Sequence, residues 1–243
     1  MSQIIEVTQR YLLPDLPPTD LPYDDGVPME SNWQRIQISL LVESTHRRWP
    51  GRTDFFAGGN MFIYYSVKQA RDREFKGPDF FVVKGVDGAR DRRSWIVWDE
   101  DARFPDVIIE LLSPTTADED LGPKKDLYER TFKTPDYFCC ADEVASLEGW
   151  RLRDGRYTAL AADEQGRLWS EELQVWLGPW TGKYQGTAST WLRFFFPDGR
   201  LVPVADEIAE TERQRAETER QRAEAAEAEM ARLRAELERL KGR

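Results

Sequence analysis

One apolar run limits what this chain can fold into more than any other feature of its sequence. Residues Val107–Leu112 read Val-Ile-Ile-Glu-Leu-Leu, a nearly continuous apolar segment with a single carboxylate inside it. Such a run is typical of a β-strand that is covered on both faces. It therefore predicts an α/β domain in which other elements pack on both sides of a central sheet.

The carboxylate of Glu110 needs a partner in that setting. A charge in a buried strand costs several kcal/mol unless it is paired with another charge or bound to a metal ion. Asp106 is on the same strand face but roughly 13 Å away, too far to share one ion. Asp79 opens a separate apolar strand, so it can lie across a ladder from Glu110 at about 5 Å. Two such carboxylates make a hard oxygen site suited to Mg²⁺, although a salt bridge from Glu110 to an arginine is the simpler alternative.

A lysine follows this strand on the next expected helix, which runs from Pro123 to about Phe132. Lys124 and Tyr128 are four residues apart and share one helix face. A turn at Ser113–Thr116 folds that helix back over the end of the strand. An inward lysine stabilises developing negative charge or positions an attacking water, whereas a lone helix lysine is more commonly just solvated.

Other segments supply the rest of the domain. A capping box at Ser31 and Gln34 predicts a helix that ends before Pro50. Further strands are expected within 54–65 (with a break at the Gly58–Gly59 pair), 80–83, 95–98 and 137–140. Between residues 150 and 204 the pattern is short strands joined by tight turns.

The C-terminal segment is a repeat of seven residues. Residues 209–215 (AETERQR) recur unchanged as residues 216–222, which predicts a long helix with a heptad pattern. Its seam is apolar only in the last two heptads. We therefore expect a largely single helix that contributes weakly to a homodimer, through Met230, Leu233, Leu237 and Leu240 at most.

Charge and composition limit the partners. The net charge is −10, and the segment from residue 209 onward holds nine acidic and nine basic residues, so the excess lies on the body. A broad electropositive DNA-binding face is unexpected, although a local basic stripe is compatible with an acidic total. Six basic residues flank the Asp79 strand and are the best candidates for DNA-backbone contacts: Arg71, Arg73, Lys76, Arg90, Arg92 and Arg93.

The same residues bear on location. No apolar run approaches the roughly 20 residues that a membrane helix needs, and the N-terminus shows no secretory signal. The two cysteines, Cys139 and Cys140, are adjacent, which argues against a disulfide framework. We expect a cytoplasmic protein that does not use a membrane.

These motifs, taken together, resemble those of a known family. The segments that carry the resemblance are Gly77–Asp79, Pro105–Pro114, Asp120–Tyr128 and Pro135–Phe138. They are similar to the Uma-two family of restriction endonucleases, within the PD-(D/E)XK nuclease superfamily. The resemblance implies a central mixed sheet flanked by helices and DNA cleavage that depends on Mg²⁺, or Mn²⁺ in its place. It also implies that Asp79 and Glu110 are metal ligands and that Lys124 is the catalytic lysine.

Three positions depart from the pattern or leave alternatives open. The usual superfamily lysine lies two residues after the glutamate, where this chain has Leu112. The resemblance moves the lysine to the helix, as Lys124 or its neighbour Lys125. Gln34 stands where many members carry a first-helix histidine, and Glu30 is either an extra acidic site residue or an ordinary helix-start carboxylate.

The sequence patterns and the resemblance together divide the chain into four expected parts. They are an N-terminal loop segment (1–28), a nuclease-like core (29–142), a β-rich extension packed on the core (143–205) and a charged helical or coiled-coil tail (206–243). The predicted function is a divalent-metal-dependent DNA endonuclease that hydrolyses phosphodiester bonds. The alternative is an inactive nuclease-like module that acts in protein interaction or assembly through its tail.

Overall fold

A mixed six-stranded sheet forms the centre of the protein. The computed structural model describes residues 18–23, 31–72 and 77–241. The strand order in the sheet is β1-β3-β5-β6-β7-β8, and only β5 and β6 run parallel to each other. The strands are β1 (Phe55–Gly59), β3 (Phe80–Lys84), β5 (Val107–Leu112), β6 (Asp136–Ala141), β7 (Leu147–Arg153) and β8 (Arg156–Ala159).

Two smaller sheets complete the strand content of the described residues. An antiparallel three-stranded sheet has the order β11-β10-β9, with bounds β9 (Leu168–Ser170), β10 (Val175–Tyr184) and β11 (Thr187–Phe195). A short parallel pair joins β2 (Ile63–Tyr64) to β4 (Trp95–Ile96). The expected strand at 95–98 is therefore shorter than predicted, because the chain turns into a 3₁₀ helix at Val97–Asp99.

Helix α1 (Asn32–Arg48) begins as the sequence predicts. The Ser31 hydroxyl accepts a hydrogen bond from the Gln34 backbone, and the Gln34 side chain accepts one from the Ser31 backbone, which completes the capping box. The helix ends before Pro50, as expected. Gln37 makes two further hydrogen bonds to the backbone of Leu192, so α1 is fixed to strand β11 as well as to the central sheet.

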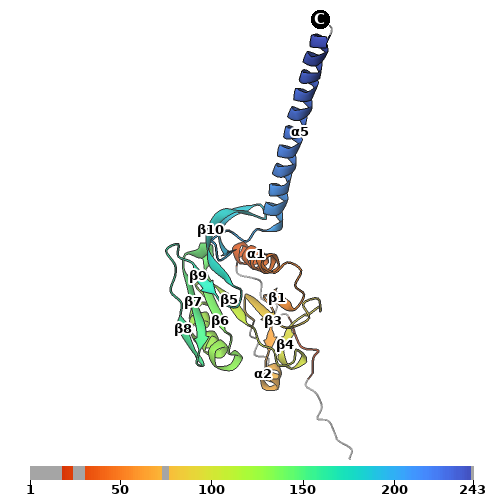
Figure 1. Cartoon of the computed structure of the whole chain (residues 1–243). Coiled ribbons are helices and arrows are strands. Elements are labelled where there is room, and N and C mark those ends of the chain that lie inside the picture. The colour runs from red at the N-terminus through yellow and green to blue at the C-terminus, as the bar shows by residue number, and fades with distance from the viewer. Residues whose placement is uncertain (1–17, 24–30, 73–76, 242–243) are drawn as a thin grey trace, which may run out of the picture.

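The central sheet is covered on both faces, as the apolar run predicted. All six residues of β5 are buried. Alternate residues enter two cores: Val107, Ile109 and Leu111 pack with α1 and the three-stranded sheet. Ile108 and Leu112 face the opposite side, where they pack with Tyr128 and Phe132 of the helical segment after β5. Figure 1 shows α1 and that helical segment on different sides of the sheet.

The helical segment after β5 begins earlier than expected and is wider than an α-helix in two places. It consists of α3 (Ala117–Glu119), η2 (Asp120–Lys124), α4 (Lys125–Leu127) and η3 (Tyr128–Phe132), and η2 and η3 are π-helical turns. The prediction that Pro123 lies in the first turn is wrong. Pro123 sits inside η2, where a wider turn relieves the clash and the lost hydrogen bond that a proline causes in an α-helix.

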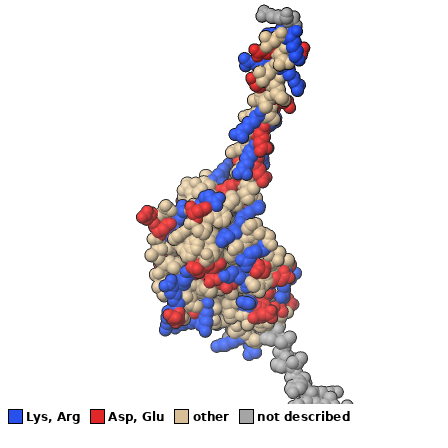
Figure 2. Space-filling view, in the orientation of Figure 1, with Lys and Arg blue, Asp and Glu red and all other residues tan. Residues whose placement is uncertain are grey.

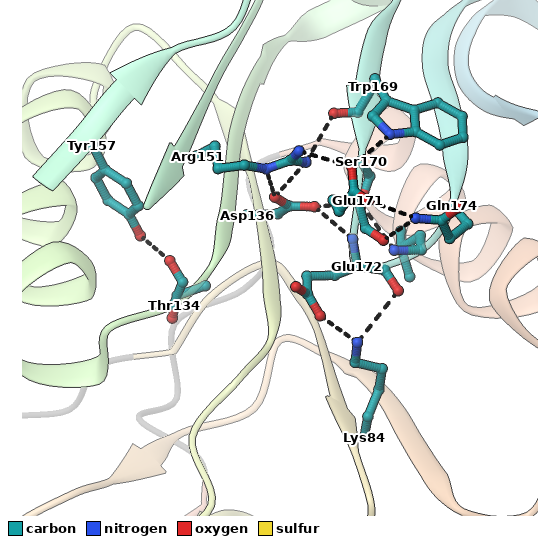
Figure 3. Close-up of polar contacts among 11 residues, drawn as sticks. Lys84, Thr134, Asp136, Arg151, Tyr157, Trp169, Ser170, Glu171, Glu172 and Gln174 are labelled. Atoms are coloured by element: carbon teal, nitrogen blue, oxygen red, sulfur yellow. Dashed lines mark hydrogen bonds and ion pairs between the residues drawn. The ribbon is translucent and has the colours of Figure 1, made fainter. Parts of the chain in front are cut away.

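The central sheet continues through the boundary expected after residue 142. β7 pairs with β6, and β8 pairs with β7, so the first part of residues 143–205 belongs to the same sheet as the core. The reason is local: a turn at 142–146 is short enough for the chain to return beside β6. The second sheet is then attached through Asp136, whose carboxylate accepts hydrogen bonds from Arg151 and from the Ser170 hydroxyl (Figure 3).

Helix α5 (Ala205–Lys241) projects from the body as a long single helix (Figure 1). None of its residues is buried. Its first turn is anchored by Glu207, which pairs with the fully buried side chain of Arg193 at 2.9 Å. Across the described ranges, no helix has the length and apolar character needed to cross a membrane. Cys139 and Cys140 are buried and free, as expected of neighbours in one strand.

Candidate active site

Asp79 and Glu110 meet across neighbouring strands. Phe80 of β3 pairs with Ile109 of β5, so continuing this antiparallel register by one residue sets Asp79 opposite Glu110. The backbone N–H of Asp79 donates to Glu110 Oε2 at 3.1 Å, and the N–H of Leu111 donates to Asp79 Oδ2 at 2.7 Å. Each carboxylate thus accepts a backbone hydrogen bond from the neighbouring strand. These two bonds hold both side chains against the backbone of the other strand.

The side chain of Glu110 points toward the helical segment after β5. It is fully buried, and Tyr128 donates its hydroxyl proton to Glu110 Oε1 at 2.8 Å. The ammonium of Lys124 lies 3.2 Å from the same oxygen. Lys124 and Tyr128 do share one helix face, and that face is turned inward to the glutamate. The simpler alternative was a salt bridge from Glu110 to an arginine. Glu110 instead pairs with a lysine.

The two adjacent lysines have different surroundings. Lys124 lies between Glu110 and Asp120, with its ammonium 2.8 Å from Asp120 Oδ1, and its side chain is only 15% exposed. The ammonium of Lys125 instead lies over the ring of Trp150, 3.6 Å from the ring centroid. A cation over an aromatic face is held there by the ring quadrupole. Of the two lysines, only Lys124 contacts the carboxylates.

Burial dominates the electrostatics of this cluster. It raises the pKa of Glu110 to about 7, against the opposing effect of Lys124. Burial also raises the pKa of Asp79, opposed by the hydrogen bond from Leu111, and that of Asp120, where the nearby charge of Glu110 adds to it. Burial would lower the pKa of Lys124, but Glu110 and Asp120 outweigh it and the pKa is raised, so the ammonium stays charged.

The donor set fits a hard divalent cation. Three carboxylates surround a single ammonium in a largely buried site, so negative charge exceeds positive charge there once the carboxyl groups ionise. The described residues hold no group of three or more His, Cys, Asp or Glu side chains arranged as a metal cage. Mg²⁺ does not need one, because it keeps several waters and binds through one or two carboxylates. Each carboxylate has about four lone-pair sites. The hydrogen bonds that Asp79 and Glu110 accept therefore leave lone pairs that can bind a metal ion.

Asp120 was not singled out as a site residue from the sequence, although it begins one of the segments that carry the family resemblance. It is 1% exposed and contacts the site lysine. The signal that could have found it is its spacing, four residues before Lys124 on the same helical segment. Asp106 lies outside the site, as expected, because its carboxylate accepts a hydrogen bond from the backbone of Lys84 at the other end of β5.

Two accessory candidates lie in or beside the site, and a third falls outside the described residues. Tyr128 contacts Glu110 directly. The Gln34 amide donates to the Leu111 carbonyl at 3.2 Å, so it positions the backbone next to the carboxylates and does not touch them. Glu30 lies outside the described residues.

The basic residues expected at the DNA backbone have unlike surroundings. Arg92 is engaged within the protein: its side chain is 3% exposed, pairs with Glu100 at 2.7 Å and stacks on Trp95. Arg90 pairs with Asp99 and Glu100. Arg93 lies over the ring of Tyr23, and Arg71 is exposed at the end of α2 (Val67–Asp72).

Arg73 and Lys76 fall outside the described residues. Acidic and basic side chains intermingle on the face of the body that Figure 2 shows, so no broad basic surface appears there. Among the residues described, Arg71, Arg90 and Arg93 keep exposed side chains, and Arg90 is paired with acidic neighbours.

A mixed sheet flanked by helices, with a carboxylate pair between two central strands, defines a restriction-endonuclease-like α/β fold. The model of the Uma-two family (Uma2), described as "Putative restriction endonuclease", matches residues 12–180, and the chain belongs to this family. Among solved structures, the chain is similar to one described as a putative nuclease belonging to DUF820 from Anabaena variabilis ATCC 29413. The two share 14% identity with a TM-score of 0.43, over 65% of this chain and 86% of that chain. No curated protein matches.

Proposed function

We propose that the protein is a divalent-metal-dependent DNA endonuclease that hydrolyses phosphodiester bonds. The observation that supports this most is the convergence of Asp79, Glu110 and Lys124 from two strands and a helix, within a chain of a restriction endonuclease family. In this proposal Asp79 and Glu110 hold the metal ion, Mg²⁺ or Mn²⁺. When bound, that ion polarises the scissile phosphate and lowers the pKa of a coordinated water.

The chain's own residues then have separate tasks. The Leu111 N–H and the Tyr128 hydroxyl orient the two carboxylates, which would hold the ion through their remaining lone pairs. Lys124 supplies a fixed positive charge beside Glu110 for the negative charge that develops on the phosphate. Asp120 holds Lys124 in place from the other side. The site opens to solvent at Asp79 and Lys124, which are both partly exposed, whereas Glu110 is fully buried.

Two neighbouring lysines provide a matched test. Plasmid DNA is incubated with the full chain and Mg²⁺ or Mn²⁺, and nicked and linear products are measured. We expect Lys124→Met to lose cleavage by about 10²-fold or more, the scale of losing one charge-stabilising group from an active site. Lys125→Met should keep wild-type cleavage, because its ammonium packs on Trp150 and faces away from the carboxylates.

Metal binding is tested separately from cutting. Calorimetric titration with Mg²⁺ or Mn²⁺ should show binding to the wild type and none to Asp79→Ala, while Asp118→Asn, on an exposed position of the same helical segment, binds as the wild type does. A folded wild type that neither binds these ions nor cuts DNA contradicts the proposal. That result favours the second function, an inactive nuclease-like module that acts in assembly.

A further inference from the structure

The end of helix α5 presents an apolar stripe that the body of the protein does not cover. Met230, Leu233, Leu237 and Leu240 are 52%, 54%, 52% and 68% exposed. Their spacing of three, four and three residues places them on one helix face. Large apolar side chains that share one face and lack a partner mark an interaction surface.

The charges beside this stripe identify the partner. With Met230 and Leu237 at heptad position a, and Leu233 and Leu240 at d, the flanking g positions are Arg222, Glu229 and Glu236. The flanking e positions are Glu227, Arg234 and Lys241. In a parallel pair of helices each g residue faces the e residue of the next heptad on the other helix. Every such pair is then opposite in sign: Arg222 with Glu227, Glu229 with Arg234 and Glu236 with Lys241.

We propose that residues 223–241 form a parallel, in-register two-stranded coiled coil with a second copy of this chain. The opposite orientation fits less well. An antiparallel pair that buries the same four apolar residues sets Met230 against Leu240 of the other copy. The antiparallel overlap is then centred at residue 235. Glu236 of one copy lies close to Glu236 of the other, and Arg234 lies close to Arg234 of the other. Like charges facing each other disfavour that arrangement.

The first half of the helix does not join the seam. Glu212 and Glu219 occupy its d positions, and a parallel pairing sets Arg215 against Arg220 of the other copy. This half is stabilised within one helix, by ion pairs such as Arg213–Glu210 and Arg220–Glu217. Acidic and basic side chains both line the projecting helix in Figure 2. We infer that residues 205–222, about 27 Å of helix, separate the paired segment from the body.

A parallel coil places two bodies at the same end. Where the proposed function also holds, two candidate sites are carried on one assembly, and a single encounter can cut both DNA strands. This consequence rests on the proposed function, but the pairing itself does not. Its test therefore measures association and orientation, which a failure to cut DNA leaves unaffected.

Association is tested by sedimentation of the full chain over a range of concentrations. We expect the mass to rise from 28.3 kDa toward twice that value, with Leu233→Glu/Leu237→Glu remaining at the lower mass. The matched control is Ala228→Glu/Ala235→Glu, which places two acids on the opposite face of the same helix and should still dimerise. A wild type that stays monomeric at hundreds of micromolar, or a seam variant that dimerises like the control, overturns the proposal.

Orientation is tested with one introduced thiol. Cys139 and Cys140 are fully buried, so Leu240→Cys supplies an exposed cysteine on the seam. In the parallel pair it faces itself and oxidises to a disulfide-linked dimer. In the antiparallel pair the two Leu240 positions are ten residues apart, about 15 Å along the axis, too far for a disulfide. Ala235→Cys on the outer face is the control. Failure of Leu240→Cys to cross-link above that control, or a mixed disulfide with Met230→Cys, refutes the parallel pairing.

Discussion

Replacing Asp136 by alanine tests whether one buried carboxylate attaches the second sheet to the first. Asp136 opens β6, beside the strand that carries Glu110, and is fully buried. Its Oδ1 accepts two hydrogen bonds from Arg151, each 2.9 Å. Its Oδ2 accepts from the Ser170 hydroxyl at 2.7 Å and from the backbone N–H of Glu172 at 3.0 Å (Figure 3).

The expected loss follows from the groups that alanine leaves behind. Removing one member of a buried ion pair costs about 3–5 kcal/mol, because the other charge stays buried without compensation. Each neutral donor left unpaired adds about 1–3 kcal/mol. Two contacts soften this: Arg151 keeps Glu171 at 3.1 Å, and the Ser170 hydroxyl still accepts from Leu173. We therefore expect the free energy of unfolding to fall by about 3–5 kcal/mol in total.

Urea unfolding followed by tryptophan fluorescence and far-ultraviolet circular dichroism measures this change. Trp169 lies beside the Asp136 cluster, with its backbone carbonyl accepting from Arg151 (Figure 3). The control is Asp198→Ala, which removes an exposed aspartate paired with Arg200 in a turn and should leave the midpoint unchanged. A loss for Asp136→Ala below about 1 kcal/mol, with an unchanged slope, refutes the view that this carboxylate fastens the two sheets.

Three further perturbations probe the site and its frame. Tyr128→Phe removes the hydroxyl donor to the buried site glutamate, and we expect thermal unfolding to show a loss of about 1.5–3 kcal/mol, together with weaker DNA cleavage. Gly59→Ala would place a methyl group 2.6 Å from the backbone carbonyl oxygen of the site aspartate and 2.2 Å from a neighbouring α1 side chain. It should therefore lower the free energy of unfolding by about 1–3 kcal/mol. Gly122→Ala, which has open space around the new methyl group, should leave the stability unchanged. Asp120→Asn removes a charged partner of Lys124, and cleavage should fall while metal binding at the carboxylate pair persists; unchanged cleavage would show that this aspartate does not position the lysine.

Local sequence patterns determined the frame of this protein. The apolar run Val107–Leu112 predicted a strand covered on both faces, and the capping box at Ser31 predicted the start of α1. Both features depend on residues a few positions apart in the chain. The sequence alone therefore predicts which strand side chains alternate between the two faces and where the helix begins. The strand period and the pairing argument also predicted that Asp79, and not Asp106, would meet Glu110, and this is what the fold provides.

Only the tertiary structure decided how the helical segment sits against those carboxylates. Two π-helical turns interrupt its regular period, so spacing alone could not tell whether Lys124 or Lys125 faces inward. Packing against Trp150 draws Lys125 away, and the same geometry brings Asp120 into the cluster. The sequence thus determined which strands carry the acids, because strand alternation is local. Which of the two lysines contacts the acids, and the presence of a third carboxylate beside it, were decided by packing between segments that lie far apart in the chain.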